Sequence, residues 1–177
     1  MVHKANVLKV SDGLFLRECR KVSKEFADVV YEEQLVDSMA ALLVRDAQRF
    51  DCVVTTNMFG DILSDQASEL SGSLGLAGSV NAGSKHCMAQ AQHGSAPDIA
   101  GQDQANPASL ILSAAMLLEW LSLRHGAREF AEAHRAIENA VDNVLADPAR
   151  RTRDLGGTRG TREFTDAVCR EIEGDSA

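Results

Sequence analysis

Clustered cysteines are absent from the sequence. The four cysteines, Cys19, Cys52, Cys87 and Cys169, lie far apart and form no CxxC pair. A zinc site or a redox dithiol therefore has no support, because both need cysteines at close spacing. Dispersed cysteines are typical of a protein kept in a reducing compartment, so we expect a cytoplasmic protein.

Basic stretches and long apolar runs are absent too. The net charge is −8, and the densest basic run, residues 150–153, lies between Asp147 and Asp154. Because nucleic-acid binders need a basic surface to neutralise phosphates, we expect no nucleic-acid partner. The most apolar segment, residues 110–121, is too short to cross a bilayer and contains Glu119. We expect no membrane partner, and no leader peptide ahead of the first motif.

The 177 residues that are present suit one globular domain or two modest lobes. Residues 1–72 alternate β-branched runs with amphipathic runs, which predicts a βα pattern. Strands are expected at 5–10, 29–36 and 52–56, and helices at 14–26, 39–49 and 61–70. Acidic and hydroxyl side chains precede each helix and are predicted to cap it, namely Ser11, Asp12, Asp37, Ser38 and Asp61.

A series of glycines, Gly72, Gly75, Gly78 and Gly83, predicts turns and a boundary between two lobes. Beyond it we expect a short strand at 86–92, a loop at 93–101 and a final loop at 154–157. Helices are expected at 107–125, 127–145 and 161–172. Asn106-Pro107 places a capping side chain before a proline at the first helical position.

Three acids and one lysine have side chains suited to metal binding or proton transfer. Asp61 and Asp65 are one helical turn apart, so their carboxylates share a face and offer hard oxygen ligands to Mg²⁺ or Mn²⁺. The alternative, favoured by spacing alone, is that Asp61 caps the helix and Asp65 is a solvated first-turn acid. Asp37 at a strand end is either functional or an ordinary cap. Lys4, before an apolar strand, is either a proton carrier or a surface charge.

The loop from His93 to Gly101 is rich in small residues, which let a ligand approach the backbone closely. Asp98 in this loop is suited to accept a hydrogen bond from a ribose 2′-hydroxyl and would repel a 2′-phosphate. This feature favours NAD over NADP. The loop does not match the GxGxxG fingerprint, and a tight connection without a ligand is an equally good interpretation.

Taken together, these segments resemble the β-decarboxylating dehydrogenases, which include isocitrate, isopropylmalate, homoisocitrate and tartrate dehydrogenases. The motifs follow the family's order and spacing from residue 3 to about residue 172, and they match its C-terminal half. They are His3-Lys4-Ala5-Asn6-Val7-Leu8, Ser11-Asp12-Gly13-Leu14-Phe15-Leu16, Val36-Asp37, Gly60-Asp61-Ile62-Leu63-Ser64-Asp65, the loop from His93 to Asn106-Pro107, and Asp154-Leu155-Gly156-Gly157 with Thr161 to Val168.

The resemblance implies an α/β fold of the isopropylmalate dehydrogenase type, with mixed sheets and flanking helices. It implies that residues 1–72 belong to a small dimerisation and metal-binding domain, and residues 73–177 to a large NAD-binding domain. Asp61 and Asp65 would bind Mg²⁺ or Mn²⁺ in one subunit, while Asp37 and Lys4 would reach that site from the other subunit of a homodimer. The adenosine half of NAD would be held by His93, Gly94, Ser95, Ala96, Asp98, Ile99 and Asn106.

The implied activity is NAD-linked oxidative decarboxylation of a 2-hydroxy acid, with Lys4 and Asp37 as catalytic residues. Residues 3–16 lean towards the isocitrate members and residues 57–75 towards the isopropylmalate members, so the choice of acid stays open.

The sequence departs from the family in two respects. Family chains are about twice as long, and the other half carries the arginines that clamp substrate carboxylates and the usual catalytic tyrosine. Four arginines on the predicted helices look like surface charges: Arg17, Arg20, Arg45 and Arg49. Gln90 also lies near the position where family members usually have an acidic residue beside the nicotinamide. We therefore expect no turnover by the chain alone. It would pair with a separate N-terminal half, serve as a non-catalytic regulatory or assembly subunit, or be a truncated inactive fragment.

Overall fold

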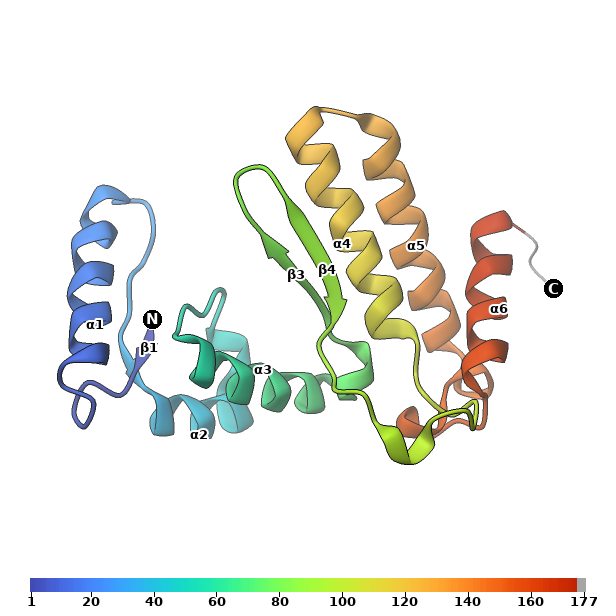
Figure 1. The fold of residues 1–177 in the computed structure, drawn as a ribbon, viewed down its shortest axis with the longest axis horizontal. Coiled ribbons are helices and arrows are strands. Elements are labelled where there is room, and N and C mark those ends of the chain that lie inside the picture. Colours follow the sequence, from blue (N-terminus) through green and yellow to red (C-terminus); the bar gives the residue numbers. More distant parts are fainter. Residues whose placement is uncertain (175–177) are drawn as a thin grey trace. The chain divides into compact units, whose positions relative to one another are not determined.

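The computed structural model describes residues 1–174, which divide into two compact units (Figure 1). The first unit is Met1–Leu70, and the second begins at Ser71. The division lies two residues before the boundary that the glycine series predicts. The roles assigned to the two parts remain predictions.

The first unit contains three helices and a small parallel sheet. Strand β1 (Val2–His3) pairs with β2 (Gln34–Leu35), and the helices are α1 (Ser11–Val22), α2 (Val36–Asp46) and α3 (Asn57–Ser71). Short 3₁₀ turns follow α1 at Ser23–Glu25 and α2 at Ala47–Arg49. The core of this unit is formed by Val2, Met39 and Leu63, with Val36, Ala40, Leu43 and Phe50 packed against it.

The strands of the first unit are shorter than predicted. Residues 5–10 form a turn, because the Lys4 carbonyl accepts hydrogen bonds from the backbone N–H groups of Val7 and Leu8. Within 29–36 only Gln34–Leu35 is a strand, and none is assigned at 52–56, although the Val54 carbonyl accepts the N–H of Val2 at 2.8 Å. A strand needs a hydrogen-bonded neighbour, and the described residues of this unit supply a sheet of two strands.

The predicted capping acids also lie elsewhere. Helix α1 begins at Ser11, one residue before Asp12, and α2 begins at Val36, one residue before Asp37. Helix α3 begins at Asn57, which places Asp61 in its second turn. The acids therefore lie inside the helices, and neither α1 nor α2 has a side-chain cap. Asp37 and Asp61 therefore do not cap their helices, so the interpretation of these two acids as helix caps is wrong.

The second unit is a hairpin covered by helices. Strands β3 (Gly78–Ala82) and β4 (Cys87–Ala91) pair antiparallel, and α4 (Ala108–His125) packs against both. Helix α5 (Arg128–Ala146) packs against α4, and α6 (Thr161–Glu173) packs against α5 (Figure 1). The three helix predictions of this unit are confirmed to within two residues at each end, whereas the glycine pattern gave no sign of β3.

Two buried serines on α4 attach the hairpin to the helix. Ser113 Oγ donates to the Gln90 carbonyl at 2.7 Å and accepts the N–H of Ser79 at 3.0 Å. Ser109 Oγ donates to the Ala77 carbonyl. Both serines are fully buried, so these bonds satisfy polar groups that would otherwise destabilise the core.

The apolar core of this unit lies between α4, α5 and α6 and includes Val141, Val144, Phe164 and Val168. The four cysteines are free thiols. Within the part of the chain that the structure describes, no helix combines the length and the apolar character needed to cross a membrane.

Candidate functional site

Lys4 and Asp37 form an ion pair in the first unit. Lys4 Nζ donates to Asp37 Oδ1, joining the segment after β1 to the first turn of α2. This bond, together with one from the backbone, holds the pKa of Asp37 below its usual range. The resemblance predicts that the two residues act together, and the fold of a single chain brings them together.

Asp12 holds the backbone of Lys4 in place. Its carboxylate Oδ2 accepts the Lys4 N–H at 2.6 Å, and the side chain is buried inside α1. The sequence suggested only a cap for Asp12. The signal for its other role was the family motif that carries Lys4 and Asp12 eight residues apart. Because a charge-assisted bond to a backbone N–H is strong, Asp12 holds the backbone of Lys4 in place just before the turn.

Asp61 and Asp65 lie on α3 with exposed side chains, one helical turn apart. Their shared face offers two carboxylates to solvent, as predicted from the spacing. Among the described residues no group of three or more histidines, cysteines or acids is close enough to hold a metal ion. Asp37 therefore does not complete a three-carboxylate site with Asp61 and Asp65 within one chain.

The second unit contains a pocket of about 370 Å³ at the predicted cofactor loop. It is lined by six of the seven predicted cofactor residues: His93, Gly94, Ser95, Ala96, Ile99 and Asn106. Its wall also includes Ser73, Gly75 and Asp154, which come from the turn before β3 and the turn before α6. This volume lies within the range of small-molecule sites.

The predicted cofactor loop has an unusual backbone at Ala96 and an outward-facing acid at Asp98. Ala96 adopts a left-handed backbone conformation with φ of 40°, which a residue with a Cβ atom rarely adopts. Asp98, the seventh predicted residue, does not line the pocket, and it is exposed in the 3₁₀ turn Pro97–Ile99. The backbone carbonyl of Asp98 accepts a hydrogen bond from Gln102 at 2.7 Å. The turn is thus held internally while the Asp98 carboxylate faces solvent.

Asp154 is the polar centre of this pocket. Its Oδ2 accepts hydrogen bonds from Ser73 Oγ at 2.6 Å and from Asn106 Nδ2 at 2.9 Å. Burial raises the pKa of Asp154, but the hydrogen bonds, led by the one from Ser73, outweigh burial and leave the pKa below its usual value. The sequence placed Asp154 only in a terminal motif, and nothing in its spacing pointed to Ser73, which is 81 residues away.

The side chain of Asn106 is fully engaged in positioning. While Nδ2 donates to Asp154, Oδ1 accepts the N–H of Ala108 at 3.0 Å, at the start of α4. The helix begins at Ala108 with Pro107 as its N-cap residue, one residue later than predicted. The two bonds fix the position of Asn106 in the wall of the pocket.

Close backbone packing explains two glycines at this site. A Cβ at Gly75 would lie 2.9 Å from Asn106 Cβ and 3.0 Å from Asp154 Oδ2. A Cβ at Gly157 would lie 2.0 Å from the Arg151 carbonyl oxygen. Because carbon atoms do not approach this closely, both positions require glycine.

Other polar residues noted in the sequence lie at the surface of the chain. Arg20 forms a two-bond ion pair with Glu33, and Arg49 pairs with Glu32, as expected of surface charges. Gln90 has an exposed side chain on β4.

Tyr31 lies outside the assigned strands, which corrects its predicted place in one. Burial raises the pKa of Tyr31 to about 12, with help from Glu33.

Comparisons with known proteins agree with the motifs. The family model described as isocitrate/isopropylmalate dehydrogenase matches residues 1–168. The chain is 47% identical over 173 residues to an isocitrate/homoisocitrate dehydrogenase of Thermus thermophilus, covering 98% of this chain and 49% of that protein. It is 43% identical over 169 residues to the mitochondrial isocitrate dehydrogenase [NAD] catalytic subunit 5 of Arabidopsis thaliana, covering 95% of this chain and 43% of that protein.

A solved structure agrees as well. The chain superposes on isocitrate dehydrogenase from Methylococcus capsulatus with a TM-score of 0.89 and 41% identity, covering 97% of this chain and 49% of that one. The predicted α/β fold is thereby confirmed. The chain spans about half the length of the curated relatives it matches. On this evidence the chain belongs to the isocitrate/isopropylmalate dehydrogenase family.

Proposed function

We propose that this chain is the C-terminal part of an enzyme that oxidises and decarboxylates a 2-hydroxy acid of the isocitrate or 3-isopropylmalate type with NAD⁺. The observation that carries the proposal is the 370 Å³ pocket, which gathers six of the residues that the family resemblance assigns to cofactor binding. The names of relatives, which include isocitrate dehydrogenase [NAD], support NAD as the cofactor.

The pocket suits the adenosine half of NAD. Small residues at Gly94, Ser95 and Ala96 leave the backbone accessible, and a Cβ at Gly94 would meet nothing within 4 Å. Asp98, exposed at the rim of the loop, would repel a 2′-phosphate and so favours NAD⁺ over NADP⁺. His93, Ile99 and the Asn106 backbone would complete the contacts.

The carboxylates suit a divalent cation that is shared between chains. Asp61 and Asp65 are hard oxygen donors of the kind that Mg²⁺ and Mn²⁺ prefer. Among the described residues Asp37 joins no three-residue cluster in one chain, which fits a site that the partner's Asp37 completes in a homodimer.

The chain's own residues would then do the following work. Lys4 would help to remove the proton of the substrate hydroxyl, and its Nζ would accept that proton in the neutral amine form, not as the ammonium of the ion pair. Asp37 would hold Lys4 by the ion pair, and Asp12 would fix its backbone. A bound cation would supply Lewis-acid polarisation of the substrate oxygens, and NAD⁺ would accept the hydride.

Calorimetry with NAD⁺ and NADP⁺ tests the cofactor part of the proposal. We expect NAD⁺ to bind more tightly, Asp98→Ala to reduce the preference, and the chain alone to give no NADH with either acid. Tighter binding of NADP⁺ would contradict the role given to Asp98. Titration with Mn²⁺ tests the cation part, since Asp61→Asn with Asp65→Asn should abolish binding if these acids are ligands.

The half-length of the chain favours a second candidate, a non-catalytic regulatory or assembly subunit. The two candidates differ when the other half of the family's chain is added. Turnover that depends on Lys4 would support the enzyme, and an assembled but inactive complex would support the subunit.

A further inference from the structure

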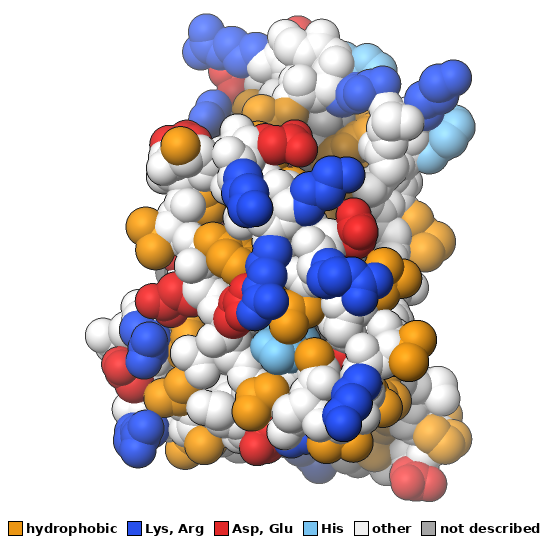
Figure 2. All heavy atoms as spheres, turned by 90° about the vertical axis from the view of Figure 1, so that its left-hand side faces the viewer, with side chains coloured by type: hydrophobic (Ala, Val, Ile, Leu, Met, Phe, Trp, Pro, Cys, Tyr) orange, Lys and Arg blue, Asp and Glu red, His pale blue; other side chains and the backbone are white. Residues whose placement is uncertain are grey.

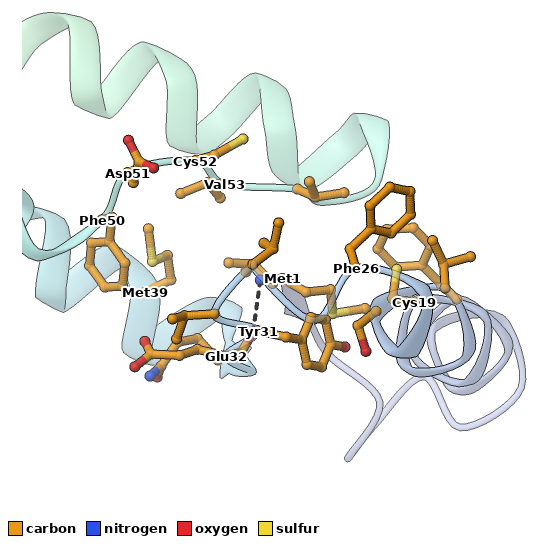
Figure 3. Close-up of a pocket in the computed structure, with 18 of the residues that line it drawn as sticks. Met1, Cys19, Phe26, Tyr31, Glu32, Met39, Phe50, Asp51, Cys52 and Val53 are labelled. Carbon is orange, nitrogen blue, oxygen red and sulfur yellow. Dashed lines mark hydrogen bonds between the residues drawn. The ribbon is translucent and has the colours of Figure 1, made fainter.

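The two hollows of the chain differ in what gives them their shape. The hollow of the first unit, of about 880 Å³, is bounded by large apolar side chains such as Phe26, Met39 and Phe50 (Figure 3). The pocket of the second unit is lined mainly by the loop 93–106, whose residues are mostly small. The shape of this pocket therefore depends on the path of the loop backbone, and a residue that fixes this path also determines the pocket.

Two residues of the loop adopt a left-handed backbone conformation, Ala96 with φ of 40° and Asp103 with φ of 54°. They enclose the segment 97–102, which is held by local bonds such as the one from Gln102 to the Asp98 carbonyl. The left-handed conformation is costly for residues with a Cβ atom, and Asp and Asn adopt it more readily than the others. Because the segment is held internally, its orientation is set at its two ends.

Asp103 attaches the second of these ends to α6. Its carboxylate Oδ1 accepts the N–H of Arg162 at 3.0 Å, and its backbone carbonyl accepts the N–H of Thr161 at 3.3 Å. Both N–H groups belong to the first turn of α6, where a helix leaves its donors unpaired. Thr161 Oγ1 adds a hydrogen bond to the Ala105 carbonyl at 2.5 Å. The end of the loop is thus tied to the start of the helix by three hydrogen bonds.

Helix α6 is a firm support for the loop, and the contact is close. Phe164, Ala167 and Val168 of this helix are buried in the core of the second unit. A Cβ at Gly160 would lie 2.5 Å from Asp103 Oδ2 and 2.7 Å from the Asp103 carbonyl oxygen. Gly160 has an ordinary φ of −82°, so it is required for the space it leaves and not for its backbone conformation.

Exposed acids are common in this chain, and exposure alone does not distinguish Asp103 from them. Figure 2 shows acidic side chains scattered among lysines and arginines on the side of the chain that carries α1. Asp103 is exposed as well, but its carboxylate and its carbonyl both bond to backbone N–H groups of α6. Its conformation and its bonds therefore set it apart from a solvated surface charge.

We propose that Asp103 is a positioning residue for the cofactor pocket, which holds the loop 93–106 on α6 in the shape that binds NAD⁺. The inference rests on the proposed function, because that function places NAD⁺ in this pocket. Asp103 acts through the loop backbone, so the affinity for NAD⁺ depends on a helix that lies mostly outside the pocket.

Calorimetric titration of three variants of the chain with NAD⁺ tests the proposal. Asp103→Ala removes the carboxylate and disfavours the left-handed conformation, so the Kd should rise about tenfold or more. Asp103→Asn keeps an acceptor oxygen and a residue type that adopts this conformation, so it should restore the Kd to within about threefold of the parent value. Gly160→Ala keeps Asp103 but pushes it away from α6, and should weaken binding as Asp103→Ala does.

The matched control is Asp147→Ala. The Asp147 carboxylate also accepts a backbone N–H at the surface, that of Ala149 at 2.9 Å, but Asp147 does not line the pocket. This variant should lose a similar amount of stability in urea unfolding and keep the Kd for NAD⁺. Without NAD⁺, amide hydrogen exchange in residues 96–104 should be faster in Asp103→Ala and Gly160→Ala, and unchanged in Asp147→Ala.

The proposal is overturned if Asp103→Ala binds NAD⁺ as tightly as the parent protein, or if Asp147→Ala weakens binding to the same extent. It is also overturned if Asp103→Asn and Asp103→Ala lose affinity equally while hydrogen exchange of the loop stays unchanged, since Asp103 would then contact the cofactor directly. A parent protein that binds no NAD⁺ would instead refute the proposed cofactor site, and this inference with it.

Discussion

Asp154 and Asn106 are joined by a hydrogen bond of 2.9 Å from Asn106 Nδ2 to Asp154 Oδ2. The bond connects the turn before α6 to the start of α4, and Ser73 adds the turn before β3 to the same carboxylate oxygen. Three separate parts of the sequence thus meet at one oxygen atom, at the wall of the pocket in the second unit.

Replacing Asp154 with Asn should lower both stability and cofactor affinity. An amide offers one acceptor oxygen in place of two and carries no charge, so the bonds from Ser73 and Asn106 would lose their charge assistance, and we expect a loss of about 1–3 kcal/mol in the free energy of unfolding. The Kd for NAD⁺ should rise about tenfold as the Asn106 backbone loses its support. Denaturant unfolding and calorimetry measure the two effects. Asp142→Asn, an exposed acid on α5, is the control, and an equal effect there would contradict the assignment.

The stabilising effect of Asp154 should depend on pH in a defined direction. Its pKa in the folded protein lies below the ordinary 3.8, so its contribution is complete above pH 4 and is lost as the pH falls through the folded pKa. The difference in Tm between the parent protein and Asp154→Asn should therefore shrink at the acidic end. Thermal unfolding monitored by circular dichroism from pH 7 downward checks this, and a constant difference would argue against it.

Tyr31 should ionise late in the folded protein. Burial beside Glu33 raises its pKa to about 12. Because the chain contains one tyrosine, absorbance of tyrosinate reports Tyr31 alone. The raised pKa favours the neutral form in the fold, so its contribution is complete below about pH 10 and is lost as the pH rises through 12. A midpoint near 10 in the native protein would show that the phenol is solvated.

Gly75→Ala should destabilise the second unit, because its Cβ would lie 2.9 Å from Asn106 Cβ. We expect a cost of about 1–3 kcal/mol from overpacking. Gly13→Ala is the matched control: a Cβ there meets nothing within 4 Å inside α1, and the change should stabilise by about 0.5–1 kcal/mol. Urea unfolding of both variants measures the contrast. Equal behaviour would mean that the turn at Gly75 relaxes freely.

The sequence predicted the helices of the second unit well because their apolar periodicity and end signals are local, whereas the helices of the first unit begin three or four residues before their predicted starts. Asn106 illustrates a local signal, since its side chain accepts the N–H two residues away, at the start of α4. The strands were overestimated for a physical reason: β-branched residues such as Val29 and Val30 indicate a preference, but pairing depends on neighbours that this chain does not provide. β3 was missed because its glycine serves close packing on α4, where a Cβ at Gly78 would lie 3.0 Å from Met116 Sδ.

The residues of the candidate site also fall into those that the sequence could predict and those that it could not. The cofactor loop is contiguous in sequence, so its residues could be predicted as a group, and six of them line one pocket. Ser73 and Asp154 could not be found, because their contact joins positions 81 residues apart without a shared pattern. The cation site stays a prediction, since it requires carboxylates from more than one chain.

Every residue that lines the pocket of the second unit comes after Ser71, whereas Lys4, Asp37, Asp61 and Asp65 all precede it. The two proposed tasks, cofactor binding and acid–base chemistry at a cation, therefore belong to separate, uninterrupted stretches of sequence. A chimera that exchanges only the part from Ser71 onward with another family member would transfer coenzyme preference while leaving the acid–base and cation-binding side chains untouched. Selection can thus adjust one property without disturbing the other.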